Sequence, residues 1–249
     1  MAPEYDASRA TYALSRQQDP QIAAMIERAL GDARSVVNVG AGAGSYESSG
    51  REIVAIEPSE TMRAQRPEGA APAIAAYAED LPLEDDSVDA GLAAMTVHHW
   101  DDPRRGLAEL RRVARKRVVL FTYDISQAGA LWLVRDYLPE IGELDRARFL
   151  PIEEQAELLG GDVRVERVPL PHDCRDGLLG AYWRRPERYL DPALHPGNSA
   201  FMTLDPKVLQ RALAKLRNDL DSGAWRRRYG GLLSRDELDV GYRLVVAEL

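Results

Sequence analysis

The sequence predicts an α/β fold built on a doubly wound, mostly parallel sheet of seven strands. Short runs of β-branched and apolar residues alternate with segments whose apolar residues recur at helical spacing. Alternating strands and helices are typical of a parallel sheet that carries helices on both faces. A glycine-rich turn at residues 40–44 directly follows the first apolar run, which indicates that the first strand–helix unit binds a nucleotide.

The first helices and strands are predicted from their apolar runs and from the residues that begin or end them. Residues 20–31 carry apolar side chains at helical spacing and close on Gly31, a usual helix stop. The β-branched run 35–39 is the first strand, and the apolar run 53–56 is the second. Ser59 is the candidate N-cap of the helix that follows.

The middle of the sheet is predicted from four further segments. Residues 73–77 are expected to form a short third strand and residues 88–95 a buried fourth strand. A helix over 106–115 has its apolar residues on one face. Residues 117–123 form the clearest strand, the fifth, because the run is almost entirely β-branched and aromatic.

The pattern changes after the fifth strand. Helical spacing predicts one helix that is stopped at Pro139 and another, at 153–161, that is stopped by glycines. A sixth strand is expected at 163–168 and the last strand at 242–246. The connection between these two strands is roughly 70 residues long, far beyond the usual length, so we expect a helical insertion in a single domain.

Composition argues against several function classes. The chain of 249 residues has 32 Lys and Arg against 40 Asp and Glu, and the resulting net charge of -8 disfavours nucleic acid as a partner. The single Cys174 and the lack of Cys/His clusters predict a reducing, cytoplasmic compartment and no metal site. No stretch of about 18 apolar residues occurs, and the first residues are polar, so we expect neither a membrane span nor a secretory signal.

The spacing of the glycines separates two nucleotide chemistries. Gly40, Gly42 and Gly44 allow close approach of the backbone to a ligand beside a helix N-terminus. The dinucleotide fingerprint requires a third glycine three residues after Gly42, where this chain has Ser45. This argues against an oxidoreductase that uses a nicotinamide dinucleotide. Glycines that serve only the turn and its packing are the alternative.

Glu57 stands at the end of the second predicted strand, 17 positions after Gly40. A carboxylate near this spacing accepts hydrogen bonds from ribose hydroxyls in nucleotide-binding strand–helix–strand units. A solvated charge at a strand end is the alternative. Together with the glycine turn, Glu57 predicts a nucleoside site.

Four segments carry a family resemblance, namely VVNVGAGAGSYE, IVAIEPSETM, AEDLPLEDDSVDAGLAAMTVHHW and AELRRVAR, which cover about residues 33–124. Together they resemble the successive motifs of the class I S-adenosylmethionine-dependent methyltransferases, in the broad type 11 subfamily that includes ubiquinone and menaquinone biosynthesis methyltransferases. The resemblance implies a Rossmann-like fold and S-adenosyl-L-methionine (SAM) as cofactor. It also implies methyl transfer to oxygen or nitrogen of a small-molecule acceptor, which we expect in secondary metabolism.

The resemblance further implies which residues contact the cofactor. The glycines would pack against its methionine and ribose parts, Met62 would contact adenine, and Ala78 and Glu79 would hydrogen-bond the adenine edge. Tyr77 occupies a position where the family often has Asp, so adenine recognition is expected to shift to Glu79 or to the backbone. The expected cofactor-binding residues are Arg16, Gly40, Gly42, Gly44, Glu57, Pro58, Met62, Ala78, Glu79 and Met95.

Catalytic candidates stand after the fourth and fifth predicted strands, because ligands in this architecture bind outside the carboxyl ends of the strands. His98 and His99 follow the fourth strand and Asp124 follows the fifth. Histidine accepts a proton near neutral pH, and a neighbouring Asp can orient it. Related enzymes that methylate hydroxyls commonly use such a pair. A structural His-His loop, with catalysis by alignment alone, is the alternative.

The insertion is expected to cover the acceptor, because the sheet alone leaves that side open to water. Trp100, Tyr182, Trp183 and Arg184 are the expected acceptor-binding residues; aromatic side chains that pack only the cap's own core are the alternative. The expected divisions are an N-terminal helical lid at 1–31, a cofactor-binding core at 32–171, a helical cap at 172–237 and the last strand at 238–249.

Two other functions remain open from the sequence. Arg-rich aromatic segments at 182–185 and 225–229 could stack bases, which would suit an RNA methyltransferase. The chain could also be a cofactor-binding protein with a non-methylating role. Both a monomer and a homodimer are compatible with the sequence.

Overall fold

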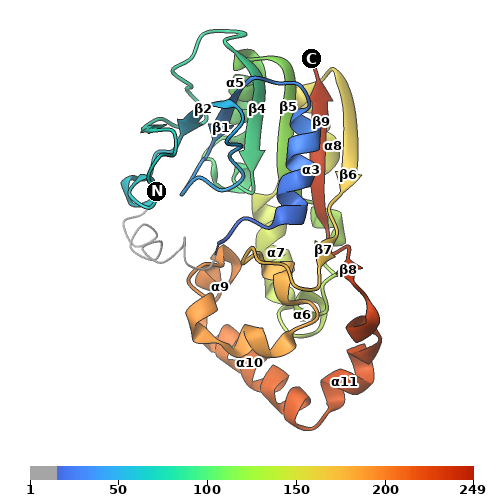
Figure 1. Ribbon diagram of the computed structural model, residues 1–249. Coiled ribbons are helices and arrows are strands. Elements are labelled where there is room, and N and C mark those ends of the chain that lie inside the picture. The colour runs from blue at the N-terminus through green and yellow to red at the C-terminus, as the bar shows by residue number, and fades with distance from the viewer. Residues whose placement is uncertain (1–15) are drawn as a thin grey trace.

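The computed structural model describes residues 16–249, and Figure 1 shows a sheet flanked by helices above a helical cap. The parallel strands point toward the cap, so their carboxyl ends face it (Figure 1). No helix within residues 16–249 is long and apolar enough to cross a membrane.

Seven strands form one sheet in the order β3-β2-β1-β4-β5-β9-β6. Their bounds are β1 Ser35–Val39, β2 Glu52–Ile56, β3 Ala73–Ile74, β4 Val88–Ala94, β5 Ala114–Tyr123, β6 Asp162–Arg167 and β9 Tyr242–Glu248. The pairs among β1 to β5 are parallel, whereas β9 lies antiparallel between β5 and β6. The predicted seven-stranded, mostly parallel sheet is confirmed.

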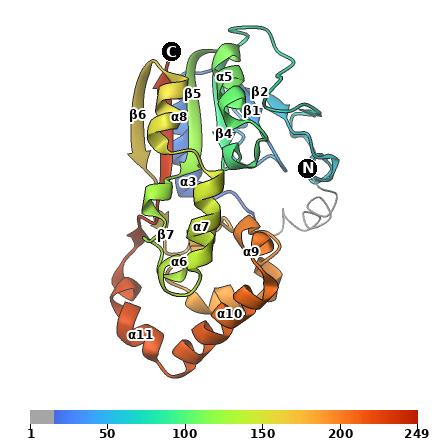
Figure 2. The same cartoon turned by 180° about the vertical axis from the view of Figure 1, so that it is seen from behind.

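Helices cover both faces of this sheet. The helices are α3 Pro20–Leu30, α4 Glu60–Arg63, α5 Pro103–Val113, α6 Trp132–Asp136, α7 Pro139–Arg148, α8 Ile152–Leu159, α9 Ser199–Thr203, α10 Pro206–Asp221 and α11 Ala224–Tyr229. Helix α3 packs on one face against β5 and β9, and α5 and α8 pack on the other (Figures 1 and 2). Strand β1 explains why both faces are apolar: Val36 joins the core beneath α3, and Val37 joins the core beneath α5.

Local signals account for the helix ends that were predicted. The Asp19 carboxylate caps α3 by accepting from the backbone N–H groups of Gln21 and Ile22, and Gly31 ends the helix with a φ of 57°. Ser59 caps α4, since its hydroxyl accepts from the N–H of Met62. The predicted cap and stop residues therefore act as expected.

Two elements differ from the prediction. Pro139 was expected to stop a helix, but α6 ends at Asp136 and Pro139 begins the next helix, α7. Proline is tolerated in the first turn of a helix because its missing N–H would have no partner there. The third strand, expected at 73–77, is only the two residues Ala73–Ile74.

Two separate segments of the chain form the cap. The segment 172–237 lies between β6 and β9, and the short strands β7 Leu170–Pro171 and β8 Glu237–Leu238 pair at its base. Helices α6 and α7, which the prediction assigned to the core at 32–171, lie beside this segment at the same end of the sheet (Figure 2). Trp132 of α6 packs its ring on Trp225 and Tyr229 of α11, at centroid distances of 5.3 and 5.5 Å.

The structure describes the predicted N-terminal lid, residues 1–31, only from residue 16 on. Residues 1–15 lie outside the described residues. Helix α3, which was counted with the lid, packs on the face of the sheet and belongs to its helical layer (Figure 1).

Candidate active site

One pocket, here called the cofactor pocket, lies at the carboxyl ends of β1, β2 and β4. Eight of the residues expected to bind the cofactor line it: Gly40, Gly42, Glu57, Pro58, Met62, Ala78, Glu79 and Met95. The topology explains this assembly, because parallel strands that are neighbours in the sheet place the residues after them at one edge.

The glycine turn needs glycine at two positions, because a side chain there would meet other side chains of the protein and the backbone φ is positive. Gly40 has a φ of 71°, and a Cβ there would collide with the side chain of Thr96. Gly42 has a φ of 53°, and a Cβ there would lie 3.2 Å from Cε of Met62. The backbone N–H groups of Gly40 and Ala41 both donate to the carbonyl of Ile56, at 2.9 Å each, which ties the turn to the end of β2.

Glu57 is held in position by two backbone hydrogen bonds. One carboxylate oxygen accepts from the N–H of Gly42 at 2.9 Å, and the other accepts from the N–H of Ser59 at 2.9 Å. The residue is 5% exposed and lines the cofactor pocket. Each oxygen can accept a further hydrogen bond, so the carboxylate fits the two hydroxyls of a ribose.

The part of the cofactor pocket formed by residues 77–79, where the adenine is expected, includes a residue that is exposed to solvent. Ala78 is buried, whereas Tyr77 is 55% exposed. The Glu79 carboxylate accepts from the N–H of Asp102 at 3.0 Å. Trp100, which was expected at the acceptor, lines the cofactor pocket instead, where its indole covers Gly106.

Two expected cofactor residues lie elsewhere. Gly44 faces the ion pair between Arg66 and Glu47, whose N–O distance is 2.7 Å. Arg16 does not line the cofactor pocket; its guanidinium pairs with the Asp176 carboxylate at the start of the cap. Arg16 was predicted to bind the cofactor from its place in the sequence alone, and this could not reveal a partner 160 residues away.

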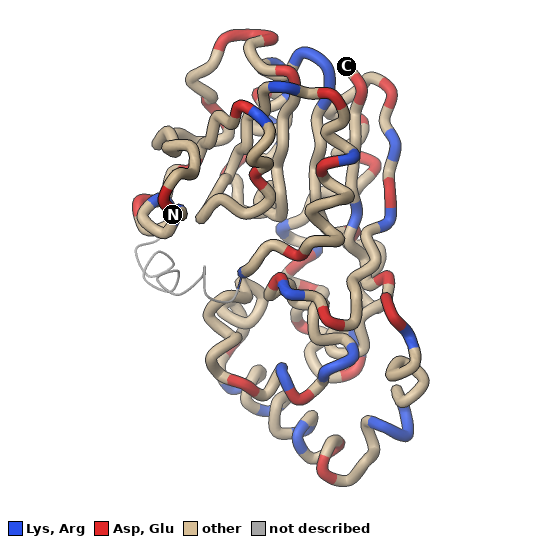
Figure 3. The backbone as a smooth tube through the Cα atoms, in the orientation of Figure 1, with Lys and Arg blue, Asp and Glu red and all other residues tan. Residues whose placement is uncertain are grey.

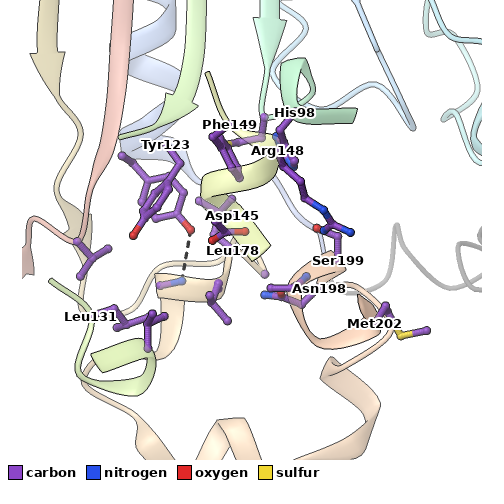
Figure 4. A pocket seen from close by; sticks show the side chains of 18 of the residues that line it. His98, Tyr123, Leu131, Asp145, Arg148, Phe149, Leu178, Asn198, Ser199 and Met202 are labelled. Carbon is purple, nitrogen blue, oxygen red and sulfur yellow. Dashed lines mark hydrogen bonds between the residues drawn. The ribbon is translucent and has the colours of Figure 1, made fainter. Parts of the chain in front are cut away.

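A second pocket, here called the acceptor pocket, lies between the carboxyl ends of β4 and β5 and the cap (Figure 4). Its wall combines aromatic rings, among them Tyr123, Phe149 and Tyr242, with apolar side chains of α6 and the cap. Met95 and His99 line both pockets, so the two adjoin at these residues. Met95 has a φ of 52°, a region that non-glycine residues rarely adopt and that is often found at functional sites.

The structure brings the two candidate histidines to the acceptor pocket but not the candidate Asp. The His98 ring stacks on Phe149 with centroids 4.1 Å apart and tilts against His99 at 3.9 Å. Asp124 does not line the pocket. Its carboxylate accepts from Ser126 and pairs with Arg243 of β9 at 3.6 Å, so the expected His–Asp pair is not formed.

The aromatic and basic residues expected at the acceptor lie outside the pocket. Trp183 is fully buried, and its Nε1–H donates to the carbonyl of Leu170 at 3.1 Å. The ring of Tyr182 packs edge-on against Tyr189, and Arg184 donates to the carbonyl of Arg235. These three residues build the cap rather than line its cavity, which the aromatic composition of the segment could not distinguish.

Sequence reasoning missed Asp145 and Arg148, which line the acceptor pocket from α7. Burial raises the pKa of the Asp145 carboxyl from 3.8 to about 6, with the positive charge of Arg148 opposing this shift. Burial, and after it the charge of Asp145, raises the pKa of the Tyr123 hydroxyl. Both residues were overlooked because Pro139 was taken to stop the helix rather than to begin α7.

Replacing Asp145 by Asn is expected to change how stability depends on pH. Between about pH 4 and pH 6 the folded carboxyl keeps a proton that the unfolded chain has lost, so the free energy of unfolding falls as the pH rises. Asp145→Asn removes this pH-dependent loss of stability, so its free energy of unfolding should exceed that of the unaltered protein by about 1–2 kcal/mol at pH 7 but not at pH 3.5. This range allows for the partial exposure of the carboxyl to solvent. Urea unfolding at both pH values measures the difference.

Glu143→Gln is the matched control, because Glu143 is an exposed acid on the same helix. A stabilisation of the same size at both pH values would show that the Asp145 carboxyl is not perturbed in the fold.

Comparisons with known proteins agree with this geometry. Residues 37–122 match the family model described as "Methyltransferase domain". The crystal structure of a putative methyltransferase from an antibiotic biosynthesis pathway of Anabaena variabilis is 34% identical, with a TM-score of 0.87, and the match covers 94% of this chain and 99% of that one.

Two further relatives extend the comparison. An uncharacterized methyltransferase of Mycobacterium tuberculosis is 33% identical over 149 residues, and this chain spans about half of its length, 53%. A SAM-dependent methyltransferase of Thermotoga maritima, described as a possible histamine N-methyltransferase, is 19% identical with a TM-score of 0.54 over 98% of this chain and 94% of that one. At that identity the second likeness shows the fold alone.

Proposed function

The chain belongs to the class I SAM-dependent methyltransferases, and we propose that it transfers the methyl group of SAM to a small molecule held in the acceptor pocket. The observation that carries the proposal is that the cofactor pocket and the acceptor pocket adjoin at Met95 and His99. Two reactants held on either side of this junction would meet in a fixed orientation, and orientation is what a methyl transfer requires most.

The residues of the cofactor pocket fit SAM. When bound, SAM supplies a methyl group made electrophilic by its attachment to a sulfonium. Glu57 would accept hydrogen bonds from the ribose hydroxyls, and the tight turn that Gly40 and Gly42 permit would bring the backbone close to the ligand. Ala78 and Glu79 would face the adenine edge, and Met62 would pack beside it.

The two histidines are proposed to act at the junction of the pockets. His99 lines both pockets, and His98 lines the acceptor pocket with its ring fixed against Phe149. An imidazole here can take up a proton that the acceptor releases. Asp124 is left out of this role because Ser126 and Arg243 engage its carboxylate.

Three observations support a small molecule over RNA. The acceptor pocket is lined mainly by aromatic and apolar side chains with a few polar groups among them, a lining that is typical of small-molecule sites. Arginines of the segments that suggested RNA bind protein groups instead: Arg185 donates to the carbonyls of Cys174 and Ala181, and Arg228 pairs with Asp136. Basic and acidic residues are also interspersed over both the sheet part and the cap (Figure 3).

The place of the reaction in metabolism is part of the proposal. The relative from Anabaena variabilis is described as a putative methyltransferase of antibiotic biosynthesis, and it matches this chain over nearly its whole length. This supports an acceptor that belongs to secondary metabolism.

Formation of S-adenosylhomocysteine (SAH) tests the proposed function. The protein is incubated with SAM and either a library of small-molecule acceptors or total RNA, and SAH is measured by mass spectrometry. We expect SAH to appear with small molecules and not with RNA. SAH formation with RNA alone, or a protein that binds neither SAM nor SAH in calorimetry, would contradict the proposal.

A further inference from the structure

We propose that the acceptor is an amine, bound as a cation whose ammonium group pairs with the carboxylate of Asp145. The inference rests on the proposed function, because it takes the acceptor pocket as the place where the methyl group is received. It names the chemical class of the acceptor, which the cofactor pocket does not determine.

Asp145 offers a carboxylate that has no partner among residues 16–249. Of the described residues that line the acceptor pocket, Asp145 is the one acid. Within residues 16–249, no backbone or side-chain group hydrogen-bonds to its carboxylate or forms an ion pair with it. Burying an unpaired charge is costly, as the raised pKa of this carboxyl shows, and a cationic ligand would remove that cost.

Aromatic rings line the same pocket as this carboxylate. Tyr123 packs edge-on against Phe149 at 5.7 Å and against Tyr242 at 5.5 Å, and the His98 ring stacks on Phe149. Figure 4 shows the Asp145 carboxylate pointing into the pocket on the side of Tyr123. The faces of such rings attract cations, and burial keeps the phenols of Tyr123 and Tyr242 neutral by raising their pKa. Carboxylate and rings therefore favour the same kind of ligand.

The positive charges of the pocket do not satisfy this carboxylate. Arg148 is three residues further along α7, but its side chain runs the other way, toward Ser199 (Figure 4), and Nη1 donates to Oγ1 of Thr203 at 3.4 Å. Arg16 pairs with Asp176, which also accepts from the hydroxyl of Tyr46 at 2.7 Å. Asp145 consequently remains available to the acceptor.

The chemistry of an amine suits a carboxylate in this place. The bound ammonium gives up one proton to an imidazole of the pocket, that of His98 or His99, and its freed lone pair forms the N–C bond while the C–S bond breaks and that electron pair stays on sulfur. Nitrogen gains the positive charge that sulfur loses, so charge moves toward the Asp145 carboxylate during the reaction. A fixed negative charge at the site where positive charge develops stabilises the transition state more than it stabilises the neutral amine from which the attack starts.

The test compares amines with alcohols of the same shape. The probes are benzylamine with benzyl alcohol, phenethylamine with phenethyl alcohol and cyclohexylamine with cyclohexanol, each titrated into the full chain in the presence of SAH. In at least one pair, we expect the amine to bind about 10-fold more tightly or better, as a charge-assisted contact should provide. Asp145→Asn should abolish the preference and Glu143→Gln should preserve it.

Binding is read by calorimetry, so the test does not depend on turnover. The inference is overturned if no amine binds, if each alcohol binds as tightly as its amine, or if the preference survives in Asp145→Asn. SAH binding in the same titration separates this failure from that of the proposed function: loss of SAH binding would reject both, whereas SAH binding without an amine preference would reject the amine alone.

Discussion

Replacing Trp183 by Ala is expected to lower the free energy of unfolding by about 3–5 kcal/mol, the cost of a large cavity in a packed core. The side chain is fully buried, and its Nε1–H donates to the carbonyl of Leu170 at the base of the cap. The backbone carbonyl of Trp183 also accepts from Nε1 of Trp132 at 2.8 Å, which joins the two parts of the cap. Chemical unfolding followed by tryptophan fluorescence and circular dichroism would measure the loss.

Trp183→Phe is the matched control, because it keeps most of the ring and removes only the indole N–H and part of the volume. It should cost clearly less than the change to Ala. If Trp183→Ala left stability within about 0.5 kcal/mol of the native protein, as is usual for surface substitutions, the side chain could not be part of a packed cap core.

Replacing Glu57 by Ala is expected to weaken SAH binding by about 1–3 kcal/mol, a rise of roughly 5- to 150-fold in Kd. The substitution removes the proposed acceptor of the ribose hydroxyls. It also leaves the N–H groups of Gly42 and Ser59 without their partner, which loosens the glycine turn. Calorimetric titration with SAH is the measurement.

Glu52→Gln serves as the control for charge, because Glu52 is exposed at the opposite end of the same strand, β2. Its SAH affinity should match that of the unaltered protein. An unchanged affinity in Glu57→Ala would mean that the ribose does not lie on this carboxylate.

Much of the sheet was predictable because its signals are local. The run Ser35–Val39 was predicted with the bounds that β1 has, and Ser59 and Gly31 act as the cap and stop that their residue types suggest. Helix α7 was not predicted, since proline both stops helices and begins them, and only the tertiary context decides between these roles.

The residues of the cofactor pocket were also predictable from local sequence, whereas those of the acceptor pocket were not. The cofactor pocket collects residues that directly follow strands of a parallel sheet, so their place in the sequence sets their place in space. The acceptor pocket depends on side-chain directions set by distant segments. Asp124 turns to Arg243, which β9 supplies, and the indole of Trp183 turns into the cap core, where its Nε1–H donates to the carbonyl of Leu170, 13 residues earlier. Neither partner could be read from the neighbouring sequence.

A crystal structure of the chain with SAH would show whether the two pockets hold the two reactants as proposed. We expect the ribose hydroxyls within hydrogen-bond distance of the Glu57 carboxylate and the sulfur beside Met95 and His99, facing the acceptor pocket. A ribose placed away from Glu57, or a sulfur that faces away from the acceptor pocket, would contradict this expectation.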